Sequence, residues 1–172
     1  MKNKLNERQA SIRMLTQSSL ICAMYIVLTY LANLFGLASG AVQLRLSEAL
    51  CVLPFFIPSS CIGLFMGCFL SNLIVSAAIP DMIFGSLATL IGAYLGSKIK
   101  NKYLVAMPTV ISNTVIVPFV IMYCYMDTVG VNEYFVTALG VFIGEVLSAY
   151  VLGTLLLLAL EKKKGLFNTK RK

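Results

Sequence analysis

The chain contains no histidine and no tryptophan, and charged residues make up only 12% of its 172 residues. Without histidine, the commonest ligand of zinc and haem and the usual base of serine proteolysis are missing. The five cysteines lie inside apolar runs and form no Cys-x-x-Cys pair, so we expect them to pack as small apolar side chains. These absences argue against a metal site, a cofactor and a catalytic centre.

Apolar residues dominate what is present. Hydrophobic residues make up 59% of the chain and the mean hydropathy is +0.87, whereas soluble domains carry about 25% charged residues. Apolar runs long enough for a membrane helix, about 18 residues or more, recur along the chain. The first run shows no Ala-x-Ala cleavage site and is read as a span. The sequence predicts an all-α membrane protein.

Helix-breaking residues divide the chain into six predicted transmembrane helices. They are expected at about residues 14–37, 47–57, 59–78, 80–97, 103–126 and 131–160. Together they form a single membrane domain, residues 14–160, between two short basic tails, residues 1–13 and 161–172. Small residues recur at helical spacing, which allows helices to approach closely in lipid.

The cations fall in three groups that predict the topology. With six spans, 13 of the 14 Lys and Arg side chains lie before the first span, in the 98–102 loop or after the last span. Because Lys and Arg gather on the cytoplasmic side, we expect both termini to be cytoplasmic. No basic face is interleaved with aromatic residues, so a nucleic-acid partner is not expected.

The remaining cation is Arg45, which lies in an external polar stretch, residues 43–50, between two long apolar regions. Ser47 is expected to cap the short second helix, and Glu48 then lies in its first turn. Asp81, after Pro80, also suits a helix start. Both acids therefore have a structural interpretation besides a ligand-binding one.

Glu145 has no such helix-end explanation, because it lies near the centre of the last predicted span. An acid at that depth costs about 2.5–3.5 kcal/mol, so it is expected to face a cavity, an ion or a partner. The structural alternatives to a ligand or ion contact are an internal partner for Glu145, such as Arg45, or protonation of the buried acid. Asn72 and Asn113 also need partners inside the membrane, from neighbouring helices or from a ligand. The polar residues predict an outward-facing pocket for a small polar molecule.

Other classes of membrane protein fit less well. The spans hold no aspartate pair for intramembrane proteolysis, and no nucleotide-binding motif for a self-powered pump is present. A carrier that works alone remains an alternative, although no inverted repeat is visible. The residues favour a small membrane-embedded binding protein, which is not an enzyme and takes its energy from partners.

Two specific motifs carry a resemblance to a known family. They are Arg-x-Ser-Glu-Ala-Leu at residues 45–50 and Asp-x-x-Phe-Gly-Ser-Leu-Ala-Thr at residues 81–89. Weaker matches occur at residues 52–56, 63–68, 71–73, 144–145 and 150–153. Over most of its length the chain resembles the queuosine-precursor transporter family (QueT), whose members are substrate-binding S-components of energy-coupling factor (ECF) transporters.

The resemblance implies a six-helix S-component bundle, a transmembrane coupling subunit and two ATPase subunits as partners, and no cofactor. In such families the first helix docks on the coupling subunit through an Ala-x-x-x-Ala face. The matching positions here are Ser19 and Ala23, which could equally pack within the chain. The family mechanism implies that the subunit topples in the bilayer and that residues 39–47 act as a gate.

The implied ligand is a 7-deazaguanine such as preQ1, preQ0 or queuine. A carboxylate accepts both adjacent donors of a guanine edge, and a second acid suits the aminomethyl cation of preQ1. The predicted substrate-binding residues are Glu145, Glu48, Arg45, Asn72, Asn113 and Asp81. The alternatives are an S-component for another vitamin, such as folate or pantothenate, and a scaffold protein that binds no small molecule.

Overall fold

The computed structural model describes residues 2–37, 43–75, 77–126 and 130–162. All regular structure in these ranges is helical, as predicted, and they contain no strand. In chain order the elements are α1 (Lys2–Leu34), η1 (Leu46–Phe55), α2 (Ser60–Ile74), η2 (Asp81–Gly85), α3 (Ser86–Lys98), α4 (Met107–Tyr125), α5 (Val131–Glu145), η3 (Val146–Leu152) and α6 (Gly153–Glu161).

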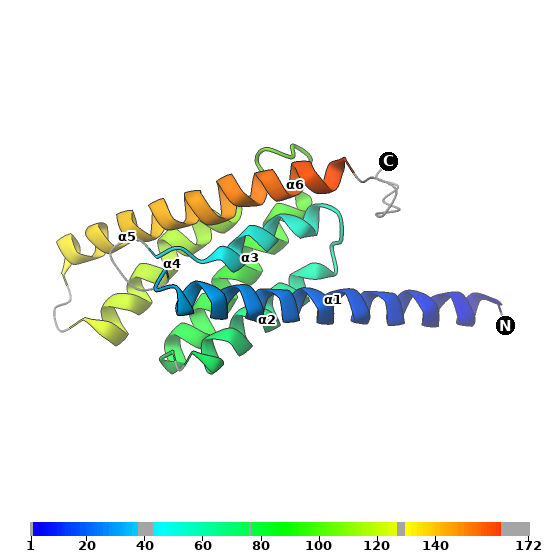
Figure 1. The fold of residues 1–172 in the computed structure, drawn as a ribbon, viewed down its shortest axis with the longest axis horizontal. Helices are drawn as coiled ribbons and strands as arrows, with labels where there is room; N and C mark the ends of the chain where they lie inside the picture. Colours follow the sequence, from blue (N-terminus) through cyan, green and yellow to red (C-terminus); the bar gives the residue numbers. More distant parts are fainter. Residues whose placement is uncertain (1, 38–42, 76, 127–129, 163–172) are drawn as a thin grey trace.

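These elements join into six helical rods, which agrees with the predicted number. The π-helical η2 runs directly into α3, and α5, η3 and α6 form one continuous rod, drawn from yellow to red in Figure 1. Three helices are long and apolar enough to cross a membrane, at Asn6–Leu34, Met107–Tyr125 and Val131–Glu161. With shorter apolar helices beside them, the chain is a multi-pass membrane protein.

Helix α1 begins at Lys2, well before the predicted start at residue 14. The predicted start followed hydropathy, which marks where a helix enters lipid. The segment before residue 14 is rich in Lys, Arg, Glu and Gln, which also favour helix outside the lipid. With 33 residues α1 is roughly 50 Å long, against a hydrocarbon core of about 30 Å. Its first turns accordingly extend beyond the rest of the bundle (Figure 1).

The second helix differs most from its prediction. Residues Leu46–Phe55 form a 3-10 helix, and no side chain caps its start, so the predicted Ser47 cap is wrong. The Ser47 hydroxyl instead accepts a hydrogen bond from Thr29 of α1, at 2.8 Å. At about 2.0 Å per residue, η1 spans roughly 20 Å, which is less than the hydrocarbon core.

The bundle buries polar residues and exposes apolar ones. Leu15, Tyr123 and Val136 are at least 70% exposed, and many other large apolar side chains also face outward. The buried polar residues include Ser47, Glu48, Ser71, Asn72, Asp81, Thr89, Asn113, Glu145 and Ser148. This distribution suits a lipid environment, where polar groups must find partners inside the protein.

Glycines set the close packing of α1 against α2. A Cβ atom at Gly63 would overlap the main-chain oxygen of Ser18, and one at Gly67 would lie 2.7 Å from the Cβ of Tyr25. The predicted small-residue stripe of this helix is therefore used within the chain. Ser19 and Ala23 of α1 take no part in these glycine contacts and are exposed.

The basic segments gather at one end of the bundle. Helix α1 begins and α6 ends at the same end of the molecule (Figure 1). The 99–106 connection also lies there, because Lys102 donates a 2.8 Å hydrogen bond to Glu161 at the end of α6. That bond raises the pKa of Lys102. The structure thus places the start of α1, the 99–106 connection and the end of α6 at one end of the bundle.

Candidate substrate-binding site

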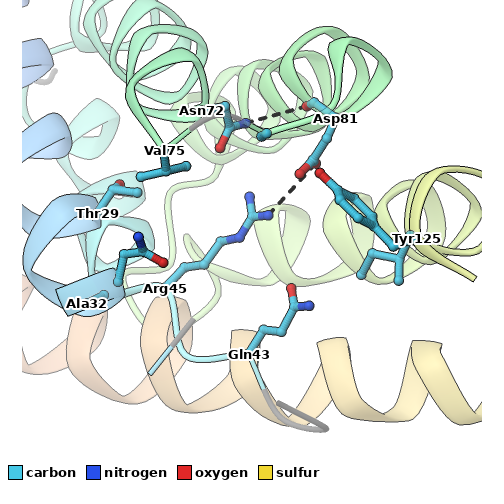
Figure 2. A pocket seen from close by; sticks show the side chains of 11 residues that line it. Thr29, Ala32, Gln43, Arg45, Asn72, Val75, Asp81 and Tyr125 are labelled. Carbon is cyan, nitrogen blue, oxygen red and sulfur yellow. Dashed lines mark hydrogen bonds and ion pairs between the residues drawn. The ribbon is translucent and has the colours of Figure 1, made fainter. Parts of the chain in front are cut away.

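A cavity of about 420 Å³ with several polar lining residues lies at the other end of the bundle, between the last turns of α1, α2 and α4. Its lining residues are Thr29, Ala32, Asn33, Gln43, Arg45, Asn72, Val75, Ala77, Asp81, Ile121 and Tyr125 (Figure 2). The volume lies within the range of about 300–1,000 Å³ that is usual for small-molecule sites. Three of the predicted substrate-binding residues, Arg45, Asn72 and Asp81, therefore share one cavity.

A loose ion pair crosses this cavity. The Arg45 guanidinium nitrogen and Asp81 Oδ1 are 3.8 Å apart, whereas charge-assisted hydrogen bonds are about 2.7–2.9 Å long. Asp81 Oδ1 is buried and accepts no hydrogen bond. Asn72 donates to the main-chain oxygen of Asp81 at 3.4 Å, as Figure 2 shows. The carboxylate is held near a cation but keeps an unused acceptor.

Local structure explains the position of Asp81. It opens the π-helical turn η2, an irregularity that is common at functional sites, directly after Pro80. The Ala78 main-chain N–H donates to the Tyr125 hydroxyl at 2.9 Å, which fixes the connection before η2 against the end of α4. Asp81 thus lies in a first helical turn, as predicted, and also faces the cavity.

Asn113 and Glu145 form a second polar group, between α4 and α5. Asn113 Nδ2 donates to Glu145 Oε1 at 2.9 Å, and both residues are at least 95% buried. The other oxygens of the pair, Asn113 Oδ1 and Glu145 Oε2, have no hydrogen-bond partner. Neither residue lines the 420 Å³ cavity. The pair therefore offers two acceptors that nothing in the described chain satisfies.

The segment that carries Gln43 and Arg45 lies beside this pair. Gly144, next to Glu145, contacts the main-chain oxygen of Gln43 so closely that a Cβ atom there would overlap it. In Figure 2 this segment runs along the yellow helical rod beneath the cavity. Gln43 thus both lines the cavity and contacts the turn of α5 that carries Glu145. Residues 39–42 of the predicted gate, residues 39–47, lie outside the described residues.

Glu48 occupies a third environment, in η1. Its side chain is fully buried and does not line the cavity. Tyr25 of α1 donates a hydrogen bond to Oε1, Cys51 donates to Oε2 at 3.1 Å, and the Thr89 hydroxyl of α3 lies 3.3 Å from Oε1. Both oxygens are therefore occupied by groups of the chain itself, and the carboxylate links three helices.

Several cavity residues were not identified from the sequence. Thr29 and Asn33 lie four residues apart near the end of α1, a spacing that puts both on one helix face. Gln43 belongs to the same polar stretch as Arg45, and Tyr125 ends α4. The spacing of Thr29 and Asn33 was a usable signal, whereas nothing local pointed to Tyr125.

Comparisons with known proteins place the chain among transporters. The QueT transporter family profile matches residues 15–162. The queuosine precursor transporter QueT of Lactococcus lactis subsp. cremoris (strain MG1363) is 32% identical over 85 residues, which are 49% of this chain and 50% of that protein. The match therefore spans about half the length of this curated relative. No solved structure matches the chain significantly. On the family match, which covers nearly all of the membrane domain, the chain belongs to the QueT transporter family.

Proposed function

We propose that this protein is the membrane-embedded substrate-binding subunit of an importer for a queuosine precursor, a 7-deazaguanine. The single observation that carries the proposal is the pair of unused acceptors, Asn113 Oδ1 and Glu145 Oε2. The relative's name supports the choice of substrate. ATP hydrolysis would occur in partner subunits.

The guanine edge matches this pair chemically. It presents N1–H and the 2-amino group as neighbouring donors, and a buried acceptor without a donor costs about 1–3 kcal/mol. Because Asn113 and Glu145 are already hydrogen-bonded to each other, their two free oxygens belong to one connected group. We propose that this group holds the guanine edge, while Arg45, Asn72 and Asp81 contact the ligand from the cavity side. Glu48 then acts behind the site rather than in it.

The proposed orientation follows from the charges. The basic segments at one end of the bundle suit the cytoplasmic face, so both termini would be cytoplasmic. The cavity at the opposite end would then open to the outside, as an importer requires. All six rods would belong to the membrane domain, with the shorter ones inserted against longer neighbours.

Binding of isolated compounds tests this proposal. We expect the detergent-purified subunit to bind at least one 7-deazaguanine, with an aminomethyl, cyano or cyclopentenediol-bearing substituent, by calorimetry. Thiamine, folate and pantothenate are expected to give no signal. A response to one of these vitamins alone would keep the transporter class and reject the substrate. If folded protein binds none of them, the scaffold interpretation replaces the proposal.

Partner docking is proposed for the exposed side of α1. Ser19 and Ala23 lie there one turn apart, away from the glycines of α2, and small residues allow a second helix to approach closely. The partner would be the coupling subunit of an ECF module, which also carries two ATPase subunits.

Enlarging this face should separate docking from ligand binding. With Ser19→Leu and Ala23→Leu together, we expect co-purification with the coupling subunit to fall by about tenfold or more, because the helices can no longer approach. Ligand affinity of the isolated subunit should stay unchanged. Val136→Phe, which enlarges a 72% exposed side chain on α5, serves as the control. Equal co-purification for both variants would reject this docking face.

A further inference from the structure

The membrane-embedded part of the chain holds more carboxyl groups than cations. Glu48, Asp81 and Glu145 are all buried, and Arg45 is the only Lys or Arg between Arg13 and Lys98. Arg45 pairs with Asp81 at 3.8 Å, and no cation of the described chain pairs with Glu48 or Glu145. This part of the chain thus holds three buried carboxyl groups and a single guanidinium.

The three carboxyl groups differ in how well the chain itself satisfies them. Glu48 accepts hydrogen bonds at both oxygens, and Glu145 accepts one from Asn113. Asp81 Oδ1 accepts none, although Asp81 is only 6% exposed, and its contact with Arg45 is too long for a hydrogen bond. Asp81 is also the only one of the three that lines the 420 Å³ cavity.

From this arrangement we infer that the cavity selects a ligand with a positive charge and that Asp81 receives that charge. An ammonium group on the ligand would form the short charge-assisted bond that Arg45 does not form. Asn72, which holds the main chain of Asp81, fixes the carboxylate in place.

The inference rests on the proposed function and narrows its substrate. Among 7-deazaguanines, one that carries an aminomethyl group is cationic at neutral pH, whereas the 7-cyano compound of similar size is neutral. The two ligands present the same guanine edge to Asn113 and Glu145. Their difference in affinity therefore reports on the site that receives the substituent.

The test measures both ligands on the same proteins by calorimetry. For the unmodified protein we expect the aminomethyl compound to bind at least about tenfold more tightly than the cyano compound. The Asp81→Asn variant keeps the shape of the side chain but removes its charge. Its affinity for the aminomethyl compound should fall by about tenfold or more. Its affinity for the cyano compound should change by less than about threefold, so the preference for the aminomethyl compound disappears.

Two further variants make the result interpretable. Asp81→Glu retains the charge and should retain the preference, which separates charge from folding. Glu133→Gln makes the matched change in a partly exposed acid on α5 outside the cavity, and should leave both affinities unchanged. Thermal unfolding without ligand confirms that each variant is folded.

Each outcome decides one question. Equal affinities for the two compounds in the unmodified protein, or a preference that survives in Asp81→Asn, would overturn the inference and leave the proposed function standing. An equal loss of affinity for both compounds in folded Asp81→Asn would also overturn the inference, because Asp81 would then contact the 7-deazaguanine ring that both compounds share. Binding of neither compound, and none of the cyclopentenediol-bearing compound, to the unmodified protein would reject the proposed function itself.

Discussion

Replacing Glu145 with glutamine is expected to lower the affinity for a 7-deazaguanine by about 100-fold or more. The substitution keeps the size of the side chain but removes the carboxylate charge, and it can turn an N–H donor toward the donors of the guanine edge. Hydrogen bonds to charged groups contribute about 1.5–3 kcal/mol each, and every 1.4 kcal/mol is a tenfold change in affinity. Calorimetry on the purified subunit measures the loss.

One control variant and one supporting variant accompany Glu145→Gln. Glu133→Gln makes the same chemical change near the start of the same helix and should bind normally. Asn113→Leu removes the partner of Glu145 and the second free acceptor, so it should also weaken binding. Unchanged affinity in folded Glu145→Gln would place the guanine edge elsewhere, and Asp81 would then be the next carboxylate to examine.

Replacing Glu48 with alanine is expected to destabilise the fold by about 3 kcal/mol. The change leaves the buried Tyr25 hydroxyl and the Cys51 thiol without their acceptor, and removing one member of a buried polar group costs about 1–3 kcal/mol per stranded partner. It also breaks the link between α1, η1 and α3. The midpoint of thermal unfolding in detergent, compared with the unmodified protein, measures the effect.

A second substitution distinguishes a structural role of Glu48 from a ligand contact. Tyr25→Phe removes one stranded hydroxyl, so it should recover part of the stability when it is combined with Glu48→Ala. Alone, Tyr25→Phe should cost about 1 kcal/mol. If Glu48→Ala unfolds like the unmodified protein but no longer binds ligand, Glu48 is a direct contact and its hydrogen bonds to Tyr25 and Cys51 are secondary.

Hydropathy and spacing predicted the outer architecture of the protein well. The apolar runs predicted an all-helical membrane chain of six rods, and the structure has these. The stripe with Gly63 and Gly67 predicted close packing, and α1 lies against it. Predictions of this kind succeed because burial in lipid and helix periodicity act on neighbouring residues, so a local stretch of sequence contains the whole signal.

Helix ends and partners were predicted less well. The start of α1, the 3-10 geometry of η1 and the hydrogen-bond partner of Ser47 all differed from expectation. The start of α1 follows from local helix propensity that a hydropathy profile does not measure, whereas the partner of Ser47 was decided by nonlocal packing. Ser47 is adjacent to Thr29 only after α1 and η1 have packed, and at that point the Thr29 hydroxyl offers it a better partner than its own helix start.

The sequence by itself determined that this protein is a helical, membrane-embedded member of its family, with a few polar groups that need partners. Only the tertiary structure decided which of these polar groups lie together and which partners each one has. It placed Arg45, Asn72 and Asp81 around the cavity, paired Asn113 with Glu145, and enclosed Glu48 among Tyr25, Cys51 and Thr89. The physical reason is that an acid inside a membrane must find a partner, but which partner it finds depends on helices that are distant in sequence and become neighbours only in the folded bundle.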